Sequence, residues 1–204
     1  MEIKAVIKLQ SLYRGYRLRR IYGKHKIKDS FTKNILIQMI DKFNDLHTFY
    51  NSLNTKLNNK KLRLPQYPSE ITENLVKFVI IKKYNSIPSW DTKKGDLYLD
   101  GKQLEVKGSS DLLNGGPSSF GPTEKWDCIY FVDAIDRKYK KFKIYEIKLS
   151  NNNEIWKNIK VNRKNTYEEQ CLQGRRPRIK FKNLIKQIPN TFIKIIFNGY
   201  IDNL

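Results

Sequence analysis

The chain has 204 residues, with 40 lysines and arginines against 20 aspartates and glutamates, which gives a formal net charge of +20. No apolar run approaches the roughly 18 residues that cross a bilayer and no signal peptide is recognisable, so we expect an intracellular protein that is neither secreted nor bound to a membrane. Positive charge spread through a whole sequence is typical of a folded surface that binds a polyanion, and nucleic acid is the simplest such partner.

Residues 1–28 are expected to form a basic, helical N-terminal segment. Residues 9–21 read Leu-Gln-Ser-Leu-Tyr-Arg-Gly-Tyr-Arg-Leu-Arg-Arg-Ile and fit the IQ pattern that calmodulin binds. A basic helix with an apolar stripe is the kind of segment that a groove-lined partner clasps. The same helix could instead pack against the rest of the chain or place its arginines on DNA phosphates. Calmodulin binding would point to a eukaryotic setting or to a virus of a eukaryotic host.

Two amphipathic helices are predicted next. The first spans residues 30–55, with Asp29 or Ser30 as its cap. The second spans residues 70–84 and is expected to be capped by Ser69. The apolar residues of the first helix recur at helical spacing and are expected to face the core. They are Ile35, Met39, Phe43, Leu46, Tyr50 and Leu53.

The most informative pattern is Gly-Asp-Leu-Tyr-Leu-Asp-Gly-Lys-Gln-Leu-Glu-Val-Lys at residues 95–107. Asp-Gly between two strand-like runs predicts a tight β-hairpin. Glu105 and Lys107 are two residues apart on its second strand, so they share a face, and strand pairing brings Asp96 beside them. Two carboxylates and an ammonium on one face suit phosphodiester hydrolysis with Mg²⁺. The carboxylates hold a hard, oxygen-seeking cation, and the lysine orients or activates the attacking water.

This Asp…Glu-x-Lys arrangement resembles the active-site motif of the PD-(D/E)xK nuclease superfamily. Gly95 stands where that motif has its proline, at a position that varies within the superfamily. Nucleases of this type often carry a further glutamate on the helix before the hairpin, where this chain has Glu70 and Glu73. The helix dipole alone explains an acid at Glu70, in the first turn, so we favour Glu73, although a solvated side chain would explain either glutamate.

A Glu-x-Lys pair on a strand is more often a solvated charge pair than a catalytic one, and the chain contains a second example. Glu146 and Lys148 form it, with Asp133 and Asp136 upstream. This second pair lies in a lysine-rich stretch, where a glutamate is more simply a counter-charge. The first pair lies in a compact hairpin that is followed by a loop rich in glycine, serine and proline, so we place the active site there.

Strands dominate the prediction from the hairpin onward. Residues 126–134 form an apolar run typical of a buried central strand, and residues 150–165 form a polar, lysine-rich stretch. We therefore predict an α/β fold in which a mixed β-sheet is flanked by helices, with residues 29–204 as one domain. The remaining expected elements are strands at 142–149, 178–181 and 192–198, a helix at 166–172 and a helical turn at 184–188.

Two further segments carry candidate DNA contacts. Residues 107–122 offer backbone N–H groups and small hydroxyls to phosphates or base edges, although the same composition describes an ordinary flexible loop. Residues 174–178 read Gly-Arg-Arg-Pro-Arg. Arginine is the best bidentate donor to guanine and also binds phosphates, and a plain basic patch is the alternative. The candidate DNA-binding residues are Ser109, Ser110, Ser118, Ser119, Lys125, Arg175, Arg176 and Arg178.

Together, the hairpin motif, the stretch Gly-Gly-Pro-Ser-Ser-Phe-Gly-Pro-Thr-Glu-Lys-Trp-Asp and the arginine segment resemble a type II restriction endonuclease of the PD-(D/E)xK superfamily, over about residues 66–200. The resemblance implies a restriction-endonuclease-like fold and an Mg²⁺-dependent, sequence-specific endonuclease that cuts double-stranded DNA, usually as a homodimer. It makes Asp96 and Glu105 metal ligands and Lys107 the residue that orients the attacking water. Homing and repair nucleases share this fold, and a non-enzymatic nucleic-acid-binding or calmodulin-responsive adaptor would need only the basic surface.

Overall fold

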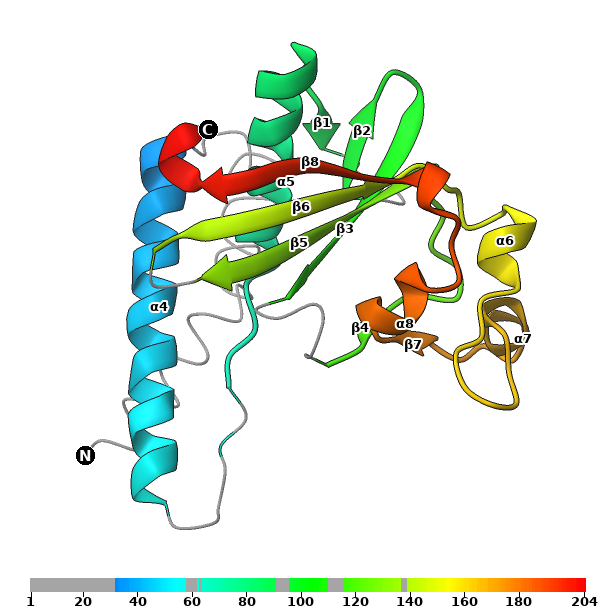
Figure 1. Ribbon diagram of the computed structural model, residues 1–204, viewed down its shortest axis with the longest axis horizontal. Coiled ribbons are helices and arrows are strands. Elements are labelled where there is room, and N and C mark those ends of the chain that lie inside the picture. Colours follow the sequence, from blue (N-terminus) through cyan, green and yellow to red (C-terminus); the bar gives the residue numbers. More distant parts are fainter. Residues whose placement is uncertain (1–31, 58–61, 63, 91–95, 110–115, 137–138) are drawn as a thin grey trace, which may run out of the picture.

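The computed structural model describes residues 32–57, 62, 64–90, 96–109, 116–136 and 139–204, so the predicted N-terminal segment lies outside the described residues (Figure 1). The helices are α4 (Lys33–Lys56), α5 (Ser69–Tyr84), α6 (Glu154–Lys157), α7 (Tyr167–Leu172) and α8 (Phe181–Ile185), with 3-10 turns η1 (Asn190–Phe192) and η2 (Ile201–Asn203). The strands are β1 (Ser89–Trp90), β2 (Leu97–Leu99), β3 (Lys102–Ser109), β4 (Ser118–Ser119), β5 (Cys128–Asp136), β6 (Lys141–Ile147), β7 (Arg178–Ile179) and β8 (Ile193–Tyr200). No helix among the described residues is long and apolar enough to span a membrane.

Six strands form the main sheet in the order β1-β2-β3-β5-β6-β8 (Figure 1). Strands β3 and β5 run parallel, and the other neighbouring pairs are antiparallel, so the sheet is mixed. Strands β4 and β7 pair antiparallel in a second sheet of two strands. The predicted α/β layout, with a mixed sheet flanked by helices, is thereby confirmed.

Two hydrophobic cores lie on the two faces of the main sheet. In the first, α4 and α5 pack against Val106 of β3 and Tyr130 of β5. Ile129 and Phe131 alternate with Tyr130 along β5 and belong to the second core, to which α6, α7 and α8 contribute. Each core takes every second residue of the central strands, because successive side chains of a strand point to opposite faces.

Helix α4 differs from its prediction in its start and in its buried face. Its N-cap is Thr32, which accepts a hydrogen bond from the Ile35 N–H at 3.3 Å, rather than Asp29 or Ser30. Ile35 was expected in the core but is 40% exposed. The helix carries apolar residues on two neighbouring rows, and the row that starts at Leu36 is the one that faces the sheet. The buried residues of α4 are Leu36, Ile40, Phe43, Leu46, His47 and Tyr50.

Helix α5 packs directly against β3. It begins at Ser69 with Pro68 at the N-cap position and no side-chain capping bond, so the predicted capping role of Ser69 is wrong. A Cβ added to Gly108 of β3 would lie 3.0 Å from the Cβ of Thr72 on α5. Such a close approach leaves room only for glycine at position 108. It brings the start of α5 against the end of β3, the strand that carries Glu105 and Lys107.

The hairpin of β2 and β3 is confirmed, with Leu97 opposite Leu104. Asp100 and Gly101 at its turn have φ values of 49° and 80°, the two left-handed residues that a tight two-residue turn needs. The polar, lysine-rich stretch at 150–165, for which no helix was predicted, contains α6, which Asn153 caps and whose Trp156 is fully buried. Further on, the predicted strand at 178–181 ends early, because Phe181 already begins α8.

Candidate active site

Strand β3 places Glu105 and Lys107 on the face of the sheet that carries the second core. Their partners across the parallel β3–β5 pair are Ile129 and Phe131, which both belong to that core. The Lys107 ammonium forms an ion pair with the Glu105 carboxylate, as the two-residue spacing predicts. Glu105 is only 4% exposed, and Lys107 Nζ lies 5.6 Å from the centre of the Phe120 ring. The pair is therefore held in a largely desolvated corner.

Asp96 joins this pair through the backbone of the hairpin. The Val106 N–H donates a hydrogen bond of 2.8 Å to Asp96 Oδ2, and the Asp96 N–H donates one of 3.1 Å to the Leu104 carbonyl. These bonds fix the Asp96 carboxylate at the start of β2, beside the residues of β3 that flank Glu105. The sequence thus correctly predicts that Asp96 and Glu105 come together at the hairpin.

The charges of the site act strongly on one another. Burial, then the neighbouring Asp96, raises the pKa of Glu105 to about 7, against the opposing effect of Lys107. Burial alone would lower the pKa of Lys107, but the carboxylates of Glu105, Asp96 and Glu124 outweigh it and raise that pKa above its usual value. Lys107 is therefore a cation at neutral pH. Three carboxyl groups thus act on this one ammonium.

The donor set fits a hard divalent cation such as Mg²⁺. Asp96 and Glu105 offer carboxylate oxygens, which Mg²⁺ prefers, and their mutual repulsion is what a bound cation would relieve. The described residues contain no group of three His, Cys, Asp or Glu side chains arranged to hold a metal. Two protein ligands suit Mg²⁺ nonetheless, because this ion usually keeps several water or phosphate oxygens. Asp96 and Glu105 could hold the ion in that way.

The two glutamates at the start of α5 differ in burial. Glu73 is 3% exposed, whereas Glu70 is only partly buried and lies within hydrogen-bond distance of the Ser69 hydroxyl, at 3.4 Å. Glu73 follows Thr72, the residue that packs against Gly108 at the end of β3. The structure thus buries the glutamate that we favoured on sequence grounds, close to the strand of the site. Its supporting role stays a prediction.

The second Glu-x-Lys pair lies on the opposite face of the sheet. Glu146 aligns with Tyr130 across β5 and β6 and accepts hydrogen bonds from the hydroxyls of Tyr130, at 2.9 Å, and Tyr84, at 3.2 Å. Burial and the neighbouring Glu146 raise the pKa of Tyr84 to about 12, so this hydroxyl stays a donor. Asp133 lies two residues from Phe131 on β5 and so shares the face of Phe131, which is opposite to the face of Glu146. Asp136 aligns with Lys141, at the other end of β6 from Glu146. These residues therefore do not assemble a second carboxylate site.

The candidate DNA-binding segments come together at the second sheet. Ser119 on β4 pairs with Arg178 on β7, and Arg176 Nε donates a hydrogen bond of 3.4 Å to the Ser119 hydroxyl. All three candidate arginines and Lys125 are exposed, whereas Ser109, Ser118 and Ser119 are partly buried; Ser110 lies outside the described residues. Two loops that are distant in sequence thus form one surface with exposed guanidinium groups. Their contact with DNA stays a prediction.

Glu124 is the residue of this region that sequence reasoning missed. Its Oε2 lies 4.0 Å from Lys107 Nζ, and its Oε1 forms an ion pair of 3.3 Å with Arg176. It therefore connects the lysine of the hairpin with the arginine segment. Its position in the Gly-Pro-Thr-Glu turn gave no signal, because no spacing rule relates it to residues of the hairpin or of β7.

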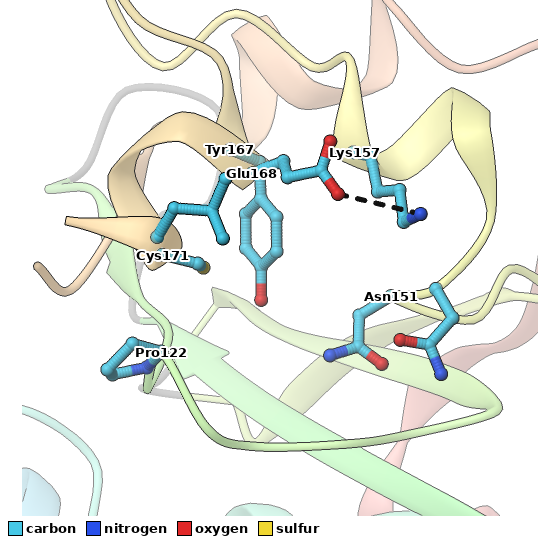
Figure 2. Close-up of a pocket in the computed structure, with 8 residues that line it drawn as sticks. Pro122, Asn151, Lys157, Tyr167, Glu168 and Cys171 are labelled. Atoms are coloured by element: carbon cyan, nitrogen blue, oxygen red, sulfur yellow. Dashed lines mark ion pairs between the residues drawn. The ribbon is translucent and has the colours of Figure 1, made fainter. Parts of the chain in front are cut away.

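Next to this turn lies a shallow pocket of about 200 Å³ (Figure 2). Figure 2 shows Pro122 and Asn151 facing Tyr167 across it, with the Lys157–Glu168 ion pair of 3.5 Å at its edge. Asn151 is structural, since it accepts a hydrogen bond from the Trp126 N–H at 3.2 Å and donates one to the Glu124 carbonyl at 2.7 Å. Asn151, which lines the pocket, thus holds the turn that carries Glu124 in place.

A mixed sheet with helices on both faces, and a hairpin that gathers two carboxylates and a lysine, define a restriction-endonuclease-like nuclease. The family model for the Bsp6I restriction endonuclease matches residues 36–188. The chain therefore belongs to the Bsp6I restriction endonuclease family, and the predicted identity as a type II restriction endonuclease is confirmed. Searches of curated proteins and of solved structures gave no match.

Family membership makes the chain a sequence-specific DNA endonuclease and DNA its partner. A second family model, for the IQ calmodulin-binding motif, matches residues 3–23. That match includes the residues 9–21 on which the sequence prediction rests, all outside the described part of the chain.

Proposed function

We propose that the chain is an Mg²⁺-dependent, type II site-specific deoxyribonuclease of the PD-(D/E)xK kind, with Asp96, Glu105 and Lys107 as its active site and Glu73 in support. The observation that carries the proposal is the convergence of the two carboxylates and the lysine at one hairpin, inside the region that matches the restriction endonuclease family. The net charge of +20 supports a large polyanionic substrate.

Each residue has a distinct part in phosphodiester hydrolysis. Asp96 and Glu105 would hold Mg²⁺, which supplies a Lewis acid at the scissile phosphate when bound. Lys107 is a cation because its pKa is raised, so it donates a hydrogen bond to the attacking water instead of removing a proton from it. The same positive charge also stabilises the negative charge that develops on the phosphate. The orienting role expected for this lysine is thus favoured over an activating one.

The arginine segment is proposed to position the duplex and to read part of its sequence. Arg175, Arg176 and Arg178 are exposed on β7 and the loop before it. The second core, which this region shares, lies on the face of the main sheet that carries the active site. We further propose a homodimer, in which each copy cuts one strand of a palindromic site, because a twofold protein matches a twofold sequence.

Plasmid DNA incubated with the protein and Mg²⁺ tests the proposal. The wild-type chain should give discrete fragments, whereas Glu105→Gln and Lys107→Ala should bind the same DNA without cutting it. Glu146→Gln is the matched control on the other face of the sheet, and it should cut normally. A gel shift without cleavage in the wild type would favour the non-enzymatic adaptor instead. Cleavage lost in Glu146→Gln and kept in Glu105→Gln would move the active site to the second pair.

The IQ match favours a second, independent function for the N-terminal segment. We propose that residues 3–23 bind a calmodulin-like protein through their basic, amphipathic sequence. Calorimetric titration of calmodulin into the full chain should give saturable binding, which Gln10→Ala combined with Arg14→Ala should weaken at least about tenfold. Equal binding by the variant and the wild type would rule out recognition through the IQ pattern.

A further inference from the structure

Glu124 is an acidic residue of the active-site region that belongs neither to the catalytic triplet nor to the candidate DNA contacts. Its carboxylate stands between two cations with different proposed roles. Oε2 lies 4.0 Å from Nζ of Lys107, and Oε1 pairs with Arg176 at 3.3 Å. One carboxylate thus links the lysine proposed for chemistry with an arginine proposed for DNA binding.

The position of this carboxylate is fixed by its own turn. The Gly121 N–H donates a hydrogen bond of 2.6 Å to Glu124 Oε2, and the Glu124 carbonyl accepts one of 2.7 Å from Asn151. A Cβ on Gly121 would lie 2.8 Å from Glu124 Cγ and would clash with the carboxylate itself. Glycine at this position is therefore required for the glutamate to fold back over the turn.

We propose that Glu124 is a positioning residue that makes the placement of Lys107 depend on whether Arg176 has bound DNA. The proposal rests on the function proposed above for these two cations. In the free protein the carboxylate divides its charge between them. A DNA phosphate or guanine that takes up the guanidinium of Arg176 leaves the carboxylate to attract Lys107 alone, which draws the ammonium away from Glu105.

The movement of the Lys107 ammonium from Glu105 toward Glu124 is favourable only when DNA is bound. A ligand shifts an equilibrium between two arrangements only as far as it binds one of them more tightly. In the free protein Glu105 is occupied by its ion pair with Lys107. Once Glu124 draws the lysine away, the Glu105 carboxylate is available for its own ligand role, and the ammonium is available for the attacking water. Binding at the arginine segment thereby completes the active site.

The variant Glu124→Gln separates binding from cleavage. At saturating enzyme and in a single turnover, the cleavage rate constant should fall about tenfold or more, because the lysine is no longer repositioned. DNA affinity should be unchanged or about two- to fivefold tighter, because Arg176 no longer breaks an exposed ion pair in order to bind. A merely structural loss would weaken binding along with cleavage.

Three companion variants sharpen the test. Gly121→Ala keeps the charge of Glu124 but displaces its carboxylate, so it should show the same loss of rate. Arg176→Ala should weaken binding, and its single-turnover rate at saturation should fall less than that of Glu124→Gln, since Glu124 is then always available to Lys107. Glu154→Gln removes an exposed carboxylate that pairs with Lys157 at 2.9 Å, and it is the control that should behave as wild type.

Wild-type cleavage rates in both Glu124→Gln and Gly121→Ala, together with inactive Glu105→Gln, would overturn this inference and leave the proposed function standing. A rate at saturation that falls in Arg176→Ala as far as in Glu124→Gln would also overturn it, because the arginine would then act directly on catalysis. A folded wild-type chain that never cuts DNA would overturn the proposed function and this inference together.

Discussion

Replacing Glu105 by glutamine should change how stability depends on pH. Burial and Asp96 raise the pKa of Glu105 from 4.5 to about 7 in the folded chain. A raised pKa means that folding favours the protonated carboxyl, so its stabilising contribution is complete below about pH 4.5 and is lost as the pH rises through about 7. The full contribution is about 3 kcal/mol. Glutamine does not titrate, so the variant lacks this dependence.

Thermal unfolding in EDTA measures the effect. Between about pH 5 and about pH 8, the melting temperature of the wild type should fall relative to that of Glu105→Gln by roughly 5–10 °C, at about 2–4 °C per kcal/mol for a chain of this size. Mg²⁺ should restore part of the loss in the wild type at the higher pH, because a ligand that binds only the folded state stabilises it. A difference in melting temperature that stays constant with pH would refute the raised pKa and the buried charge behind it.

Gly108→Ala should cost about 1–3 kcal/mol of unfolding free energy by crowding Thr72. Gly116→Ala, with open space around it, should leave the melting temperature unchanged, and equal melting temperatures for the two variants would contradict the close approach of α5. Tyr130→Phe should cost about 1–3 kcal/mol in a denaturant titration, because a buried carboxylate loses a donor, while cleavage continues at the wild-type rate. DNA affinity should fall linearly on a logarithmic salt scale, and Arg176→Ala should lower the slope by about one if that residue contacts a phosphate; a flat salt response would exclude a charge-driven interface.

The hairpin could be predicted because its signals are local. Asp100 and Gly101 define the turn, the turn fixes the register, and the alternation of side chains then places Glu105 and Lys107 together. Alternation also explains why the second Glu-x-Lys pair forms no second site. Which face a strand presents depends on its partners, and this information is missing from a pattern of two residues.

The features that sequence reasoning missed all depend on contacts between distant segments. Glu124 meets Arg176 only because β4 pairs with β7, and no local pattern encodes that pairing. The buried face of α4 was misjudged at Ile35 for a related reason, since the sheet selects one of two adjacent apolar rows. Helix α6 was missed because it is a single turn in a polar stretch, and the burial of its Trp156 in the second core depends on distant parts of the chain.

The two cores have a consequence for how this family can diverge. Strand β3 is fixed from one side by Val106 and the residues of α5, while its charged side chains project toward the other side, where β7 and the loop before it carry the exposed arginines. Mutations that reshape the arginine loop therefore leave the packing behind the hairpin untouched. New sequence specificities can evolve on this scaffold by drift in the arginine loop, while the packing of α5 behind β3 keeps the strand of the cutting residues in place.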